Sequence, residues 1–478
     1  MKSPLHPTFC PGDQNINLKI TVFMKKITFA LLAIATVSFC GCQKEMPTPT
    51  PAEESLNIIN IMENGKELDN PYYGNGVPYL LDGSMETLES FRHVSRGRVY
   101  YMDYKVQYPW ENLIKKDNKF NVNDYPAFNN EVNQTFGLGE AQGFIDAPRG
   151  CSGFICKNEK NELLFGRNLD GVPGQMVILF NRNVPEGEYK SVMLSNVCYA
   201  NRWNGTTEYD QDSTLLKKGQ DLGVLLKQNM AAMDGMNEHG LCFAAYQLPN
   251  YQHYKDGELA EVEYPGDSPR PWSINQNTGK PQITLSVLHN RILSTCRTVE
   301  DVKKLFQSYD YTCLIPNTAV HWFVADAEGH CAVFEYWNCG IDPTTGEKTP
   351  DTLYIMDTEK DRYLATHGTL AQVPYERNSI ENYYCNVEAN YTFNTDRWQL
   401  GFSNKCRVQR MMTYYWPEMS EQNALRCLQQ GNFCMEYASP QVTDWSCVYN
   451  PKQGTLLFNM RDDLSEVYFL DVFAELGK

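Results

Sequence analysis

The sequence predicts an α+β fold in which antiparallel sheets are covered by helices, and three observations support it. Short segments such as ELLFGRN (162–168) and QMVILFNRN (175–183) are apolar and bounded by polar turn residues, as strands are. Several pair across polar turns, for example DAEGH (326–330) and NPKQG (450–454), as antiparallel hairpins do. Helical stretches lie between these strand groups. Strand groups that alternate with helix groups favour stacked layers.

The helices are predicted from apolar spacing and from their ends. Thr298 begins a helix over 298–309, with Asp301 three residues later in a capping arrangement. The other predicted helices cover 213–233, 283–296, 406–416 and 420–430. Residues 249–282 are rich in Pro, Gly and charge, and we expect a polar loop or insertion there.

Composition excludes some classes of function. The formal net charge is −16 and no basic run is present, so a phosphate-tracking surface and a nucleic-acid partner are not expected. The eight histidines are scattered without HExxH or other ligand spacing, so we expect no metal site. Sixteen cysteines in an exported protein would permit disulfides, but their connectivity cannot be read from sequence.

The N-terminal region carries an export signal. From Met24 the chain reads MKKITFALLAIATVSFCGCQKE: two lysines, an apolar run and small residues, which is typical of a secretory signal. Gly41 before Cys42 resembles a bacterial lipoprotein box, so Cys42 is the predicted lipidation site. The alternative is ordinary signal cleavage. We therefore expect an exported bacterial protein, periplasmic or held at the outer membrane only by its lipid.

Three parts follow from this organisation. Residues 1–42 are upstream residues and signal, 43–150 a tether and pro-segment, and 151–478 a catalytic domain. The tether QKEMPTPTPAEESLN is rich in Pro, Thr and Glu. Aromatic clusters such as YYMDYKVQYPW (100–110) then predict that residues 56–148 pack on something.

The stretch RGCSGFICKNEKNELLFGRNLD (149–170) gathers the reactive groups. If its hairpin folds about Glu159, Cys151 lies directly opposite Arg167, with Cβ atoms about 5 Å apart. A guanidinium at that distance lowers a thiol pKa. Asp170 would lie just beyond the strand end, within reach of the Cys151 nitrogen.

Cleavage between Gly150 and Cys151 would free the α-amine of Cys151 and so supply a general base next to the thiol. A freed α-amine titrates near pH 7.7 to 8, so it can accept the thiol proton as general base. The residues also allow plainer interpretations. Cys151 would then be a small buried side chain or half of a disulfide, Arg167 a cap on a sheet edge, and Asp170 a turn former.

At these residues the sequence resembles the choloylglycine hydrolase family of N-terminal nucleophile hydrolases, which includes bile salt hydrolases and penicillin V acylases. An N-terminal Cys followed by FGRNLD matches Cys151, Arg167 and Asp170, and DGMNEHGLCFAAYQLP (234–249), CRVQRM (406–411) and DWSCVYNPKQGTLLF (444–458) agree in order. The resemblance implies a four-layer αββα fold with two antiparallel sheets between helical layers. It also implies hydrolysis of linear amide bonds without a cofactor.

The resemblance assigns further residues. It makes Asn237 an oxyanion donor and Arg407 a second site arginine; otherwise Asn237 is a turn residue before Gly240 and Arg407 a surface arginine. Where the family usually has an Asn after Thr, this chain reads YLATHGTL, so His367 is the candidate donor there. Asn237 favours bile salts, because some penicillin acylases of the family have Tyr there.

The predicted protein is therefore an exported amidase that takes a small N-acyl amide, with self-association left open. Its substrate would be a conjugated bile salt, a penicillin, or an N-acyl amino acid or fatty amide. The long leader departs from many bile salt hydrolases, and self-cleavage or an outside protease acting near Arg149 would each remove it. Two rivals are a papain-like cysteine protease, with residue 150 still attached, and a surface lipoprotein that captures ligands.

Overall fold

The computed structural model describes parts of the chain from residue 56 onward, all of which belong to one unit, Leu56–Lys478. The described residues are 56–68, 79–94, 98–121, 124–139, 150–171, 174–197, 222–248, 252–255, 258–261, 274, 276–314, 319–337, 351–357, 379–381, 419–429, 442–461 and 463–478. The signal peptide with Cys42, the predicted helix 406–416 with Arg407, and His367 lie outside these residues.

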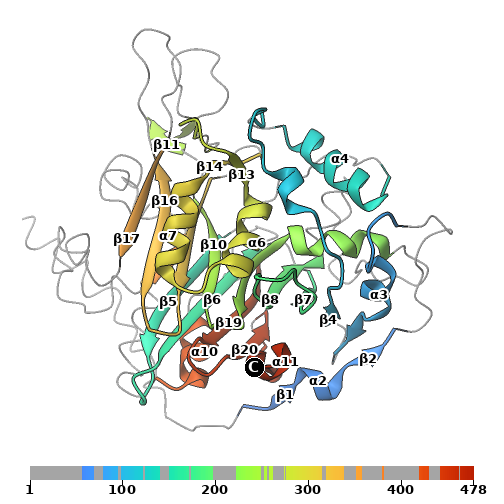
Figure 1. Cartoon of the computed structure of the whole chain (residues 1–478). Helices are drawn as coiled ribbons and strands as arrows, with labels where there is room; N and C mark the ends of the chain where they lie inside the picture. Colours follow the sequence, from blue (N-terminus) through green and yellow to red (C-terminus); the bar gives the residue numbers. More distant parts are fainter. Residues whose placement is uncertain are drawn as a thin grey trace, which may run out of the picture. The chain divides into compact units, whose positions relative to one another are not determined.

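Two large sheets form the centre of this unit (Figure 1). Sheet A runs in the spatial order β1 (Ile58–Asn60), β21 (Val467–Asp471), β20 (Thr455–Met460), β19 (Val442–Asn450), β6 (Leu163–Gly171), β5 (Gly150–Lys157) and β18 (Ser379–Glu381). All neighbours are antiparallel except β1 and β21, which are parallel.

Sheet B is the larger of the two. Its order is β17 (Thr352–Asp357), β16 (Cys331–Trp337), β15 (Ala319–Ala325), β10 (Cys242–Leu248), β9 (Ala232–Asn237), β8 (Ser191–Asn196), β7 (Met176–Asn181), β4 (Val99–Asp103), β3 (Arg92–His93) and β2 (Lys66–Glu67). Its neighbours are antiparallel except β4 and β7. The hairpin turns predicted at 326–330 and 450–454 are both present.

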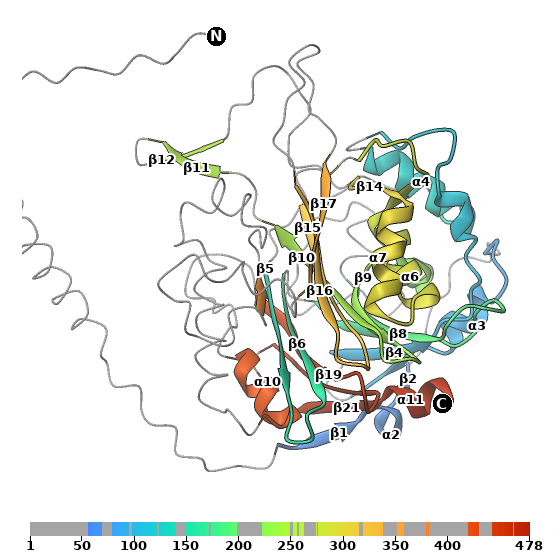
Figure 2. The ribbon, with the colours of Figure 1, turned by 60° about the vertical axis from the view of Figure 1, so that its left-hand side comes forward.

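Helices cover the outer faces of both sheets, as Figure 2 shows. Helix α10 (Glu421–Gln429) packs on sheet A through an apolar cluster that includes Phe154 and Leu164. Helices α6 (Leu285–Thr295) and α7 (Val299–Ser308) cover sheet B, where Phe306 packs edge-on against Trp322 at 5.1 Å. The predicted four-layer αββα fold is confirmed.

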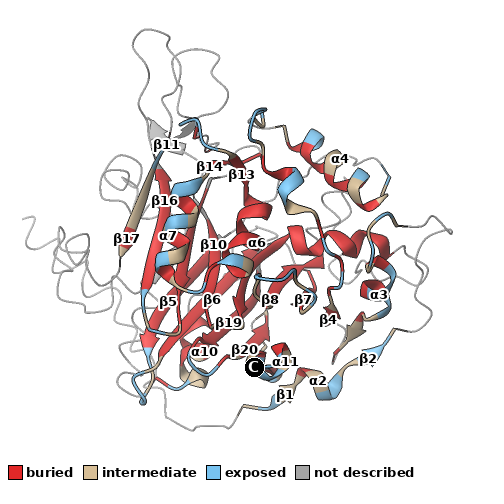
Figure 3. Cartoon of the chain, viewed as in Figure 1, coloured by how far each residue is buried: buried red, intermediate tan, exposed pale blue. Residues whose placement is uncertain are grey.

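The inner faces of the sheets meet each other. Phe165 of β6 lies 5.3 Å from Phe323 of β15, measured between ring centroids. Figure 3 shows that the strands at the centre of both sheets are buried along most of their length. A residue on an inner face therefore has sheet on both sides of it and little access to water.

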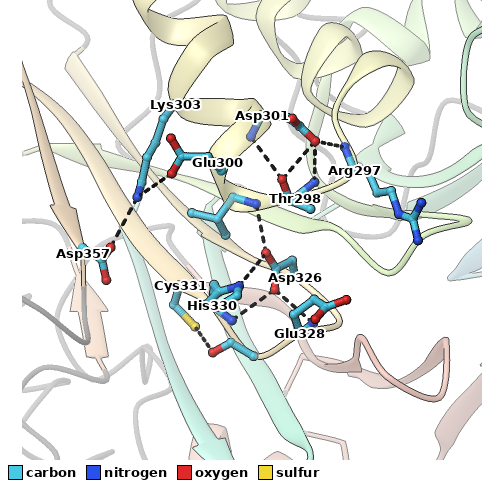
Figure 4. A network of polar contacts seen from close by, with 12 residues as sticks. Arg297, Thr298, Glu300, Asp301, Lys303, Asp326, Glu328, His330, Cys331 and Asp357 are labelled. Carbon is cyan, nitrogen blue, oxygen red and sulfur yellow. Dashed lines mark hydrogen bonds and ion pairs between the residues drawn. The ribbon is translucent and has the colours of Figure 1, made fainter.

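The start of α7 shows how local signals set an element. Thr298 and Asp301 form the predicted capping box. The Asp326 carboxylate also accepts the backbone N–H of Val299 at 3.0 Å and that of His330, in its own turn, at 3.1 Å (Figure 4). One buried carboxylate thus joins the β15–β16 turn to the helix start, where it also complements the helix dipole.

Shorter elements complete the fold. They are α2 (Ile61–Asn64), α3 (Ser84–Glu89), the 3₁₀ helix η2 (Trp110–Leu113), α4 (Tyr125–Phe136), η3 (Leu222–Met230), α11 (Val472–Leu476), and the strand pairs β11 (Gln252–Lys255)–β12 (Glu258–Glu261) and β13 (Gln282–Thr284)–β14 (Asp310–Thr312). The helix expected at 213–233 is in part wrong, because η3 ends at Met230 and strand β9 begins at Ala232. The insertion expected at 249–282 contains the β11–β12 hairpin.

Candidate active site

The β5–β6 hairpin positions the reactive groups, but its register differs from the predicted one. The Asn158 side chain accepts the backbone N–H groups of Lys160 and Glu162, each at 2.9 Å, and Asn161 takes a positive φ of 60°. The turn is therefore centred at Lys160, not at Glu159. Cys151 pairs with Leu169 and Gly153 with Arg167, so the predicted direct opposition of Cys151 and Arg167 is wrong by two residues.

The shift in register does not separate the two groups. Because it is an even number of residues, Cys151 and Arg167 stay on the same face of the sheet. Arg167 Nη1 lies 3.6 Å from Cys151 Sγ. A Cβ atom at Gly153 would collide with the Tyr246 hydroxyl, so the glycine leaves room for Tyr246 beside this pair. Cys151 is 3% exposed and Arg167 fully buried.

Sheet B holds the guanidinium in place from across the sandwich. Arg167 Nε lies 2.7 Å from Asp234 Oδ2 of β9, and both side chains are fully buried. The Nε–H is not aimed along this contact, so it is an ion pair and not an aligned hydrogen bond. Nη2 donates to the Ala245 carbonyl at 3.0 Å and Nη1 to the Asn168 carbonyl at 2.6 Å.

Asp234 is in turn held by two aromatic residues of β19. The Tyr449 hydroxyl donates to Asp234 Oδ1 at 2.6 Å, and Trp445 Nε1 donates to Oδ2 at 3.3 Å. A buried carboxylate is expensive unless it is paired and hydrogen-bonded, and this one has both kinds of partner. Three strands from two sheets thus fix the orientation of Arg167 toward Cys151.

Burial and charge act in opposite directions on the thiol. Burial raises the pKa of Cys151 above its usual value, and the adjacent Arg167 opposes this without cancelling it. Arg167 lowers the pKa of the thiol, as predicted, but the Cys151 pKa as a whole is raised, because burial has the larger effect. For Arg167, burial would lower the pKa, yet Cys151 and Asp234 raise it beyond the ordinary value, so the guanidinium stays charged.

Asp170 lies inside β6, opposite Gly150, and not beyond the strand end as predicted. Its backbone hydrogen-bonds the Cys151 thiol, and its Oδ1 accepts the Thr443 hydroxyl at 2.5 Å. The structure therefore brings Cys151, Arg167 and Asp170 together. The bond between Gly150 and Cys151 lies within strand β5.

Asn237 does not join this group. Its Nδ2 donates to the carbonyls of Leu293 at 2.9 Å and Cys296 at 2.8 Å, and its Oδ1 accepts two backbone N–H groups of the turn that contains Gly240. Both amide hydrogens are used, so these contacts do not support the predicted oxyanion role. They match the plainer interpretation of a turn residue, while the preference for bile salts, which was inferred from the identity of Asn237, stays a prediction.

Two residues of the site were not predicted, Asp234 and Tyr246. The Tyr246 ring lies 5.3 Å from Arg167 Cζ, and its buried hydroxyl has no hydrogen-bond partner among the residues that the structure describes. The available signals were weak: an acidic residue inside a buried strand, and a large phenol that follows Ala244 and Ala245. His367 and Arg407 lie outside the described residues, so their roles remain predictions.

Other features lie away from the cysteine. A cavity of about 300 Å³ is lined by Tyr108, Glu111, Asn229, Arg291 and their neighbours, and by none of the site residues. The described part of the chain holds no cluster of His, Cys, Asp or Glu arranged for a metal. Its helices include none that is long and apolar enough to cross a bilayer. The eight cysteines in the described segments are thiols, not disulfides.

The solved structures that align with the chain include those of two enzymes. A variant of the conjugated bile acid hydrolase from Clostridium perfringens aligns at 14% identity with a TM-score of 0.42, covering 69% of this chain and 94% of that one. Penicillin V acylase from Agrobacterium tumefaciens aligns at 14% identity with a TM-score of 0.40, covering 68% and 89%.

Sequence comparison gives the family. The bile salt hydrolase/transferase of Clostridium perfringens (strain 13 / Type A) is 26% identical over 192 residues, 39% of this chain, so the match spans about half of that relative, 47%. The family model for linear amide C–N hydrolases of the choloylglycine hydrolase family matches residues 151–264, beginning at Cys151. Over these residues the chain is similar to the choloylglycine hydrolase family.

Proposed function

We propose that this protein is a cysteine-dependent hydrolase of linear amide bonds, activated by cleavage between Gly150 and Cys151. The observation that carries the proposal is that the family match begins at Cys151, whose sulfur lies 3.6 Å from the buried Arg167 guanidinium. A permanent buried cation beside a thiol serves to stabilise a thiolate, which is the reactive form.

The uncut chain has the features of an inactive precursor. Cys151 is almost fully buried, burial raises its pKa, and its nitrogen is an amide inside β5. An amide nitrogen accepts no proton at neutral pH. Cleavage would convert this nitrogen into an α-amine with a pKa near 8, so that nucleophile and base belong to one residue.

The reaction then follows from these groups. The α-amine takes the thiol proton, and the thiolate attacks the amide carbonyl carbon. The resulting α-ammonium protonates the leaving amine as the C–N bond breaks, which leaves a thioester. Water, deprotonated by the same amine, hydrolyses the thioester and restores the thiol. We assign the Tyr246 hydroxyl to the developing oxyanion, where a donor is worth roughly 3 to 4 kcal/mol.

The substrate class in this proposal is an N-acyl conjugate with an apolar acyl part. The named relatives act on conjugated bile salts and on penicillin V, so these two and the N-acyl amino acids or fatty amides are the candidates. Export and lipidation at Cys42 belong to the same proposal and rest on the sequence of residues 24–42. Detergent partitioning with lipid-specific labelling tests the anchor.

Mass spectrometry of the purified mature protein, followed by a substrate panel, tests the proposal. A polypeptide that begins at Cys151 and hydrolyses taurocholate, penicillin V or an N-acyl amino acid is the expected result. An active protein whose chain still runs through residue 150 into 151 would contradict the mechanism and favour a papain-like protease. Ligand capture that survives complete alkylation, with no hydrolysis, would favour a binding lipoprotein.

A further inference from the structure

The segment upstream of the proposed cleavage site is built into both sheets. Strand β1 pairs with β21 in sheet A, and β4 pairs in parallel with β7 of sheet B over Val99–Asp103. Two backbone bonds extend the second ladder: Met176 N–H to the Arg98 carbonyl at 3.0 Å, and Tyr104 N–H to the Phe180 carbonyl at 2.9 Å. In Figure 1 these blue strands lie beside β7 and the C-terminal elements.

Side chains join the same two parts of the chain. Arg182 donates to Asp103 at 2.9 Å, and the Tyr104 hydroxyl donates to the Leu226 carbonyl at 2.9 Å. Lys115 and Gln282 exchange backbone hydrogen bonds of 3.1 and 2.7 Å. These contacts lie far apart along the upstream segment, so it is attached along its length and not at one point.

The contact is also hydrophobic. Upstream residues with 0% exposure belong to the same continuous core as the strands of sheet B: Ile61, Leu88, Val99, Met102, Val132 and Phe136. Separation of the segment would expose these side chains and those of β7 that they cover. It would also leave the main-chain groups of β7 on that side without partners, which is costly in a buried strand.

The upstream segment also supports the site indirectly. From β4 the sheet continues through β7 and β8 to β9, which carries Asp234. Asp234 is the ion-pair partner of Arg167, and Arg167 faces Cys151. Loss of β4 would turn β7 into a sheet edge only two strands from β9.

We propose that residues 56–150 are not discarded after cleavage but remain bound to residues 151–478 as a second, noncovalent subunit that the active site requires. The cleavage itself comes from the proposed function, on which this inference rests. The partner that covers the edges of β7 and β21 is thus residues 56–150 of the same chain. The mature enzyme is then a complex of two polypeptides.

The experiment makes the cut independently of any self-processing. A recognition site for a sequence-specific protease is placed between 140 and 149 in the full-length Cys151→Ala variant, and complete cutting is verified on a denaturing gel. We expect both fragments to co-elute in size-exclusion chromatography and to give a 1:1 mass in native mass spectrometry. An upstream fragment that elutes alone overturns the proposal. Failure of the proposed activation would instead appear as uncut wild-type protein.

A matched pair of variants locates the attachment. Met102→Asp places a charge at a fully buried position of β4, whereas Met85→Asp changes a position of α3 that is 38% exposed. In the cut protein, Met102→Asp should lower the bound upstream fraction at least tenfold, and Met85→Asp should leave it unchanged. Hydrogen exchange gives an independent measurement: in the parent protein, the amides of Met176 and Tyr104, which bond across the β4–β7 contact, should stay protected after the cut. Rapid exchange there would contradict retention.

Discussion

The two faces of the β5–β6 hairpin carry different chemistry. Toward sheet B, Cys151 and Arg167 meet Asp234 in a buried polar group. Toward α10, Cys156 lies in an apolar cluster with Phe154 and Leu164. Burial raises the pKa of both cysteines, but only Cys151 has a guanidinium that opposes the rise. Burial alone therefore keeps a thiol protonated and unreactive, and the adjacent Arg167 guanidinium is what distinguishes Cys151 from Cys156.

The largest expected effect separates the two cysteines directly. Cys151→Ala should lower amide hydrolysis by the mature enzyme at least about 10³-fold, since no other group supplies the nucleophile. Cys156→Ala should leave the rate per folded molecule unchanged and cost stability of only about 1 kcal/mol. Initial rates and urea denaturation of both variants measure this. Equal activity of the Cys151→Ala and Cys156→Ala variants would show that the two faces of the hairpin do not differ in catalytic role.

Next in size is the cost of breaking the buried charge pair. Arg167→Met leaves the Asp234 carboxylate buried without its cation, which should cost about 3 to 5 kcal/mol of unfolding free energy. Urea denaturation measures the loss. The double variant Arg167→Met/Asp234→Asn should recover part of the stability but none of the activity. An Arg167→Met variant as stable as the parent would show that the Arg167–Asp234 ion pair does not stabilise the fold.

Substitutions on the apolar face of the hairpin, toward α10, should lower the stability of the protein and leave its activity unchanged. Leu164 is fully buried under α10, and Leu164→Ala removes its packing at an expected cost of about 2 to 5 kcal/mol. Because α10 lies on the far side of sheet A from Arg167, kcat per folded molecule should not change. A kcat that falls with stability would show that the two faces are coupled.

The smallest effect concerns the titration of the thiol. Arg167 opposes the rise in the Cys151 pKa, so the cation-free double variant should have a higher Cys151 pKa than the parent. Its alkylation profile should move to higher pH, and labelling below the pKa should fall about tenfold per pH unit of displacement. Mass spectrometry of the Cys151 and Cys156 peptides measures this. A profile that moves to lower pH would contradict the role of the guanidinium.

Much of the architecture followed from local sequence signals. Strand alternation, the polar turns at 326–330 and 450–454, and the Thr298 capping box each depend on neighbouring residues, so they could be predicted without knowing the fold. The same alternation placed Cys151 and Arg167 on one face. That conclusion survived an error in register because the error was an even number of residues.

What the sequence alone determined was therefore many of the elements of residues 151–478 and the placement of Cys151 and Arg167 on one face of a hairpin. Only the tertiary structure decided that Asp234 and Tyr246 approach Arg167 from the opposite sheet. It also decided that the Asn237 amide donates to the carbonyls of Leu293 and Cys296. The same holds for the upstream strands, which complete both sheets. The physical reason is distance along the chain. Period and capping act over a few residues, whereas packing between sheets joins residues whose separation carries no local signal.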